Sequence, residues 1–138
     1  MKSIAENNYY FSYQLIDQLI KQGVQDFFLA PGSRSTPLVL AIANHFEARS
    51  HIHFDERGLA FYALGYAKAS KKPVTILVTS GTAVGNLLPA VMEAKHDSVP
   101  LILLTADRSP ELRDCGANQS CNQVRIFGSY VNWQIDLP

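Results

Sequence analysis

Asp55 and Glu56 stand side by side where a strand-like stretch at 50–54 gives way to helical spacing. A carboxyl group at that junction could exchange a proton with a bound heterocycle, as a general acid or base does. The same two carboxylates could instead serve only to stabilise the first turn of a helix, because negative charge there interacts favourably with the helix dipole. The two residues by themselves favour this second interpretation.

An arginine follows an earlier apolar run, in the segment Pro31-Gly32-Ser33-Arg34-Ser35. Gly32 permits a tight turn, and the helix start that follows presents unpaired N–H groups that attract anions. The planar guanidinium of Arg34 can hold a carboxylate through two parallel hydrogen bonds. The segment therefore indicates either an anion site or an ordinary strand-to-helix turn with a solvated arginine, and its spacing alone does not separate the two.

Two further polar segments follow apolar runs. Ser80-Gly81-Thr82-Ala83 reads as a glycine turn at a helix start, but it lacks the Gly-Lys-Ser/Thr of a P-loop, so it indicates a phosphate site only weakly. The longer stretch 105–119 has the polar composition of a functional loop. In it, Asp107 and Arg108 could contribute to a site or form no more than a local ion pair.

The histidines and cysteines do not indicate a metal site. His51 and His53 lie two apart on a predicted strand and share a face, but a metal would need a third ligand, so packing and hydrogen bonds are expected to satisfy them. Cys115 and Cys121 are expected to be free thiols, because disulfides are rare in reducing compartments. The chain is therefore expected to supply no metal ligand.

Helical and strand-like spacing alternate along the chain. Asn7 or Asn8 can cap the first helical stretch, and Gly23 stands where that helix would end. Continuous apolar runs such as 73–79 are typical of parallel strands buried on both faces. We expect helices over 8–22, 36–46, 55–70, 82–95 and 122–127, and strands over 26–30, 50–54, 73–79, 99–105 and 131–137.

This alternation predicts an α/β fold, a three-layer αβα arrangement with a mostly parallel sheet and helices on both faces. The length suits a single domain over residues 1–138. Ligands gather at the carboxyl ends of parallel strands. The four polar segments, at 31–35, 55–56, 80–82 and 107–119, should therefore converge along one edge of the sheet.

Composition and charge exclude several classes of function. Lys+Arg and Asp+Glu balance at 12 each, so no basic excess indicates nucleic acid or a membrane surface as a partner. No apolar run reaches the roughly 18 residues of a membrane span. The polar start, Met1 to Asn8, lacks the apolar core of a signal peptide. We therefore expect a globular cytoplasmic protein.

Four groups of residues occur in a characteristic order and spacing: Ala30-Pro-Gly-Ser-Arg-Ser-Thr-Pro-Leu38, His53-Phe-Asp-Glu-Arg-Gly-Leu59, Val78-Thr-Ser-Gly-Thr-Ala-Val84, and Leu103-Leu-Thr-Ala-Asp-Arg108 with Glu111-Leu112 and Asp114-Cys-Gly-Ala-Asn-Gln119. With these stretches the chain resembles the thiamine-diphosphate-dependent synthases of the menaquinone pathway, which join 2-oxoglutarate to isochorismate. A glutamate after the second strand is common to many thiamine-dependent decarboxylases. The Ser-Arg-Ser-Thr and Cys-Gly-Ala-Asn-Gln segments are more specific to this synthase.

The resemblance implies a role for each matching position. Glu56 would be the catalytic residue that hydrogen-bonds the aminopyrimidine ring of thiamine diphosphate and so helps to remove a proton from the thiazolium carbon. Gly81 and Thr82 would lie near the cofactor ring. The positions that would contact the two substrates are Ser33, Arg34, Arg108, Asn118 and Gln119.

The resemblance also implies what the 138 residues leave out. In the family, a diphosphate-binding domain holds Mg²⁺, and the cofactor spans this domain of one subunit and the pyrimidine domain of another. We therefore expect an N-terminal fragment of a three-domain homo-oligomer, a dimer or tetramer, inactive alone and with an exposed apolar patch where the partner docks. Ser109 and Cys121-Asn122 depart from the family pattern, and Arg113 is left without an assigned role, with a mere surface charge as one interpretation.

Two other interpretations remain open. A different thiamine-dependent enzyme, such as an acetohydroxyacid synthase or a 2-oxo acid decarboxylase, would share Glu56 but would not need the segments around Arg34 and Gln119. A non-catalytic binding or oligomerisation module with the same fold would be favoured by an unusual burial of Glu56.

Overall fold

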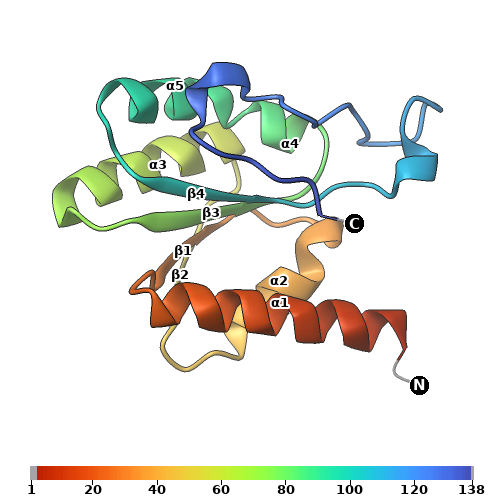
Figure 1. Cartoon of the computed structure of the whole chain (residues 1–138), viewed down its shortest axis with the longest axis horizontal. Helices are drawn as coiled ribbons and strands as arrows, with labels where there is room; N and C mark the ends of the chain where they lie inside the picture. Colours follow the sequence, from red (N-terminus) through yellow and green to blue (C-terminus); the bar gives the residue numbers. More distant parts are fainter. Residues whose placement is uncertain (1–2, 138) are drawn as a thin grey trace.

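Within residues 3–137, four parallel strands form the centre of the molecule (Figure 1). They are β1 (Asp26–Leu29), β2 (Arg49–Ile52), β3 (Val74–Val78) and β4 (Leu101–Thr105). Their order across the sheet is β2-β1-β3-β4, and each neighbouring pair is parallel, so the predicted parallel sheet is confirmed. The computed structural model describes residues 3–137. Met1, Lys2 and Pro138 lie outside the described residues. All three belong to the predicted domain range, and Met1 and Lys2 belong to its polar start.

Helices cover both faces of the sheet. On one face lie α1 (Ile4–Lys21) and α2 (Thr36–Ala43), and on the other lie α3 (Glu56–Ser70), α4 (Thr82–Gly85) and α5 (Leu88–His96) (Figure 1). Because successive strand residues point to opposite faces, Phe27 and Leu77 join the apolar cluster under α1 and α2, whereas Phe28 and Ile76 join the cluster under α3 and α5. The predicted three-layer α/β fold is confirmed.

The first helix begins earlier than its apolar spacing predicts. It starts at Ile4 and not near Asn8, because Ser3 and Glu6 form a capping box: Glu6 N–H donates to Ser3 Oγ at 3.2 Å, and Ser3 N–H donates to Glu6 Oε2 at 2.6 Å. The predicted end is confirmed, with Gly23 in the left-handed region just beyond the helix. Among the helices within residues 3–137, none has both the length and the apolar character to cross a membrane.

Two predicted helices are shorter in the structure. The helix expected over 82–95 is divided into α4 and α5, because Pro89 has no N–H to donate and its ring would clash with the carbonyl of Gly85. Helix α2 ends at Ala43, so Phe46 lies beyond it, 90% exposed, and stacks on His45.

The C-terminal part of the prediction is wrong. Residues 122–127 form a turn followed by a short 3-10 helix at Gly128–Tyr130, and residues 131–137 form no strand but run past β4 as an irregular chain (Figure 1). The alternating apolar side chains suggested a strand, but this segment makes no ladder with β4. Instead, Asn132 accepts a hydrogen bond from Lys95, and Asp136 pairs with Arg113.

Candidate functional site

The polar segments that follow the strands lie at one edge of the sheet, as the parallel topology requires. Gly32 packs so closely on the segment after β3 that a Cβ there would lie 2.3 Å from Thr79 Cβ. Gly81, after β3, packs in the same way on Gln119, in the loop after β4. The His53 N–H, after β2, donates to Leu29 O at the end of β1, at 3.1 Å. These contacts join the chain after β1 to the chain after β3, the chain after β3 to the loop after β4, and the chain after β2 to the end of β1. The predicted convergence of the strand ends is therefore confirmed for these segments.

Asp55 and Glu56 have different surroundings. Asp55 caps α3, because its Oδ1 accepts the Gly58 N–H at 2.6 Å, and its own N–H donates to His53 Nδ1 at 3.1 Å. The helix-stabilising interpretation is therefore confirmed for Asp55. Glu56 is the first residue of α3 and is half-buried. Within residues 3–137 no hydrogen bond or ion pair engages its side chain, so both carboxylate oxygens remain available to a ligand.

Arg34 lies in a 3-10 turn, Ser33–Ser35, directly before α2. Its side chain is exposed and makes no ion pair or hydrogen bond with the rest of the described chain, so its guanidinium is free. Ser35 occupies the N-cap position of α2, but its hydroxyl donates back to Gly32 O at 3.0 Å and does not cap the helix. The loop is thus shaped by its own hydrogen bonds, and Arg34 takes no part in them.

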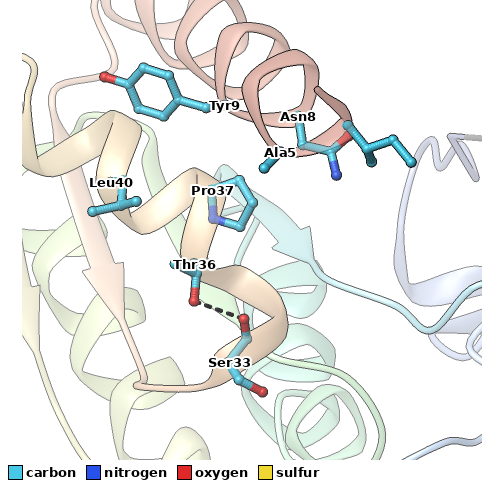
Figure 2. A pocket seen from close by; sticks show the side chains of 8 residues that line it. Ala5, Asn8, Tyr9, Ser33, Thr36, Pro37 and Leu40 are labelled. Atoms are coloured by element: carbon cyan, nitrogen blue, oxygen red, sulfur yellow. Dashed lines mark hydrogen bonds between the residues drawn. The ribbon is translucent and has the colours of Figure 1, made fainter. Parts of the chain in front are cut away.

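Ser33 lines a pocket of about 520 Å³ between α1 and the start of α2 (Figure 2). Figure 2 shows Thr36 Oγ1 donating to Ser33 O, at 2.7 Å, with Pro37 and Leu40 on the same side of the pocket. The side chains that line it are mainly apolar, and no charged group is among them. The pocket therefore does not suit a carboxylate.

Arg108 and Asp107 do not pair with each other as the sequence suggested they could. Asp107 accepts the backbone N–H of Arg108 at 2.7 Å, but its ion pair is with Arg113, whose Nη2 lies 2.8 Å from Asp107 Oδ2. Arg113, to which the sequence assigned no role, also reaches Asp136, at 3.3 Å, so it pairs with two carboxylates and is more than a surface charge. Arg108 Nη2 donates to Asn118 O at 2.6 Å. The Nε of the same side chain is buried and has no partner in the described chain.

A groove of about 2200 Å³ runs along β4 between α1 and residues 131–137. Arg34 and Arg108 both line it, so two predicted substrate-contacting cations face one cavity. The other predicted site residues do not line the groove; they are Ser33, Glu56, Gly81, Thr82, Asn118 and Gln119.

Gly81 and Gln119 are brought into direct contact. Gly81 has φ +73°, and a Cβ there would lie 2.8 Å from Gln119 O, so only glycine fits this turn. The buried Ser80 hydroxyl donates to the same oxygen at 2.9 Å. Thr82, the first residue of α4, is exposed beside them, and Asn118 precedes Gln119 on the exposed side of the loop.

Sequence reasoning missed Gln123, which fell inside a helix predicted over 122–127. Its Oε1 accepts the Gly81 N–H at 2.8 Å, and its Nε2 donates to Ala106 O at 3.0 Å. Nothing in the sequence around Gln123 singled it out, because its partners, Gly81 and Ala106, lie far from it along the chain.

The sequence also gave no sign of a network at the other end of the sheet. Asp26 is 3% exposed and receives hydrogen bonds from Arg49 Nε and Nη2, at 3.0 and 2.7 Å. Tyr66 Oη donates to it at 3.1 Å, and His51 Nε2 lies 3.0 Å away. The hydrogen bonds from Arg49, with those of His51 and Tyr66, lower the pKa of Asp26 to about 2, although burial opposes this. Since His51 also stacks on Phe28, the prediction that packing and hydrogen bonds satisfy it is confirmed.

Cys115 and Cys121 are free thiols, as expected. No group of three histidine, cysteine, aspartate or glutamate side chains within residues 3–137 is arranged to hold a metal ion. Large apolar side chains are exposed on both sides of Glu56 in the sequence: Ile52 is 66%, Phe54 86% and Phe61 45% exposed.

Comparison with known proteins gives a consistent result. The chain is 58% identical to a protein of Salinibacter ruber over 130 residues, which are 94% of the chain. It is 59% identical to a protein of Rubrobacter xylanophilus over 124 residues, or 90% of the chain. A protein of Aeromonas salmonicida is 56% identical over 134 residues, or 97% of the chain. All three are named 2-succinyl-5-enolpyruvyl-6-hydroxy-3-cyclohexene-1-carboxylate synthase. The chain spans 22–23% of the length of these relatives.

A family profile extends over most of the chain. Residues 11–126 match the family described as thiamine pyrophosphate enzyme, N-terminal TPP binding domain. These residues contain β1 to β4, the α3 start with Glu56, and the Gly81–Gln119 contact. The chain therefore belongs to the family of N-terminal TPP-binding domains of thiamine pyrophosphate enzymes.

Proposed function

We propose that this chain is the N-terminal domain, over residues 1–138, of a transferase that decarboxylates 2-oxoglutarate and adds the succinyl group to isochorismate in menaquinone biosynthesis. The names of the relatives support this proposal, since all three are synthases of the product of that addition. Because the chain spans about a fifth of their length, we assign it one part of the reaction and expect it to be inactive alone.

The observation that carries the proposal is the free carboxylate of Glu56. Asp55 caps α3, so Glu56 is not needed there, and it stays half-buried and unpaired within residues 3–137 at the edge where the strands end. Such a group fits the aminopyrimidine edge of thiamine diphosphate, which presents a ring nitrogen that can share a proton. When bound, the cofactor supplies the carbanion chemistry. Glu56 holds the shared proton at its carboxyl oxygen and orients the ring.

The same edge supplies groups for the substrates, each of which carries carboxylates. Arg34 has a free guanidinium, and the guanidinium of Arg108 donates to the Asn118 carbonyl; both arginines line the groove along β4. Charge-assisted hydrogen bonds from such groups fit carboxylates. We assign substrate contacts to Ser33, Arg34, Arg108, Asn118 and Gln119, and a place beside the cofactor ring to Gly81 and Thr82.

We assign the rest of the cofactor site to another part of the enzyme. In the proposed assembly, the diphosphate-binding domain of a second subunit completes the pocket and supplies the Mg²⁺ ligands, in a cytoplasmic homodimer or homotetramer. The exposed side chains of Ile52, Phe54 and Phe61 support a docking face beside Glu56, because exposed apolar groups of this size mark interaction surfaces.

Two alternatives make different predictions. Another thiamine-dependent decarboxylase or synthase would turn over pyruvate and would not respond to isochorismate. A non-catalytic module would show no effect of thiamine diphosphate. Glu56 is half-buried and not enclosed in the core, which does not favour the second alternative.

The test is an assay of the full-length enzyme with 2-oxoglutarate and isochorismate, with pyruvate as the competing substrate. We expect Glu56→Gln to lower kcat by about 100-fold or more, because a positioned acid–base group contributes on that scale. Asp55→Asn is the matched control: asparagine also caps helices, so the variant should keep activity within about threefold of the wild type. Near wild-type turnover of Glu56→Gln would overturn the role of Glu56, and preference for pyruvate would overturn the proposed reaction.

A further inference from the structure

Gln123 connects two parts of the candidate site that are far apart in the sequence. Its Oε1 accepts the N–H of Gly81, which belongs to the turn after β3, at 2.8 Å. Its Nε2 donates to the carbonyl of Ala106, directly after β4, at 3.0 Å. The Ala106 N–H already donates to Val78 O, continuing the ladder between the two strands. The amide therefore fits one orientation only, with its oxygen toward the N–H and its nitrogen toward the carbonyl.

The turn that Gln123 holds is the one that contacts Gln119. A Cβ on Gly81 would lie 2.8 Å from Gln119 O and 3.1 Å from its Cγ, and the Ser80 hydroxyl donates to the same oxygen. Gln119 itself has φ +54°, a conformation that a non-glycine residue keeps only where its surroundings impose it. Ser80 bonds the Gln119 carbonyl directly, and Gln123 holds Gly81, against which Gln119 packs.

The other hydrogen bonds of this loop do not anchor it to the sheet. Arg108 donates to Asn118 O, and Ser120 Oγ donates to Leu112 O, so both bonds lie within the loop. Within residues 3–137, the hydrogen bonds that join residues 118–123 to the turn after β3 are those of Ser80 and Gln123. Apart from one short 3-10 turn, Pro110–Leu112, residues 106–123 have no regular secondary structure that would keep them in place.

We propose that Gln123 is a positioning residue: by bridging Gly81 and Ala106, it places Asn118 and Gln119 for contact with the second substrate. This inference rests on the proposed function, in which Asn118 and Gln119 contact substrate and Glu56 activates the cofactor. Glu56 lies at the β2–α3 junction and has no bond to Gln123. Loss of the bridge should therefore impair the capture of isochorismate and spare the earlier decarboxylation.

The test compares two readouts in the full-length enzyme. One is the KM for isochorismate, and the other is the release of carbon dioxide from 2-oxoglutarate without isochorismate. Gln123→Ala removes both hydrogen bonds, and we expect the KM to rise by about tenfold or more, since small misplacements of contact groups have effects of this size. Carbon dioxide release should stay within about threefold of the wild type, the scale of a group that takes no part in that step.

Two further variants keep the test decisive. Gln123→Glu keeps the shape and the acceptor for Gly81 but places a carboxylate oxygen opposite the Ala106 carbonyl oxygen, where the two acceptors repel, so its KM should rise at least as far as that of Gln123→Ala. Asn122→Ala is the matched control, because within residues 3–137 the Asn122 side chain accepts only the N–H of Val124, in its own segment, at 3.0 Å. It should behave as the wild type in both readouts.

The outcomes separate this inference from the proposed function. An unchanged KM for isochorismate in both Gln123 variants would overturn the inference, and so would an equal loss in both readouts. A wild-type enzyme that does not use isochorismate would overturn the proposed function instead. If Gln123→Ala does not fold, the Gln123→Glu variant decides the matter by the same comparison.

Discussion

The two ends of the sheet use the same kinds of charged side chain in opposite ways. At the amino end, the carboxylate of Asp26 is saturated by Arg49, His51 and Tyr66 and is almost fully buried. At the carboxyl end, Glu56 and Arg34 have no partner within residues 3–137. A buried charge is stable only when it is paired, whereas a group that must bind a ligand has to be left unpaired until the ligand arrives. Pairing, and not residue type, therefore distinguishes the buried network around Asp26, which we call the anchor, from the candidate site.

The largest expected effect on stability is at the amino end. Asp26→Ala would remove the shared acceptor of a network that joins β1, β2 and α3, leaving Tyr66 and His51 without this partner. We expect the free energy of unfolding to fall by about 3 kcal/mol, which is typical of removing one member of a buried charged pair. Urea unfolding of the chain would measure it. A loss below about 1 kcal/mol, the scale of an exposed pair, would mean that the network is no anchor.

Acid should weaken the same end of the molecule. The pKa of Asp26 is lowered to about 2 from 3.8, so its contribution is fully present above its unfolded pKa and is lost as the pH falls toward the folded value. We expect on the order of 2 kcal/mol to disappear between about pH 5 and pH 2. Unfolding experiments across that range would show it, and Asp26→Asn should flatten the corresponding part of the curve. An equally steep curve in the variant would assign the acid sensitivity to other carboxylates.

The smallest effect on stability is expected at the carboxyl end. Arg34 is exposed and unpaired, so Arg34→Ala should change the free energy of unfolding by no more than about 0.5 kcal/mol. In the full-length enzyme, the same change should raise the KM for a carboxylate substrate by about tenfold or more, because a charge-assisted contact is lost. Substrate titration with parallel thermal unfolding would test both parts. A destabilised variant with normal KM would remove the contrast between the two ends.

Local patterns predicted most of the fold. The apolar runs that became β1 and β3, and the helix from Glu56 to Ser70, follow from spacing and caps that involve neighbouring residues. The errors arose where a second local signal was overlooked or where partners were needed. Ser3 and Glu6 were an unused capping signature, and Pro89 was an unused break. The predicted strand at 131–137 failed because a strand requires a ladder partner, which no local pattern can supply.

By itself, the sequence determined the alternation of helices and strands, the polar segments at the strand ends and the position of Glu56 at a helix start, because these depend on residues within a few positions of one another. The tertiary structure decided which charges are paired. Asp26 meets Arg49 across 23 positions, and Gln123 meets Gly81 across 42, since right-handed crossovers bring neighbouring strands together from distant parts of the chain. A hydrogen bond depends on the geometry of both groups, and that geometry exists only once the sheet is assembled.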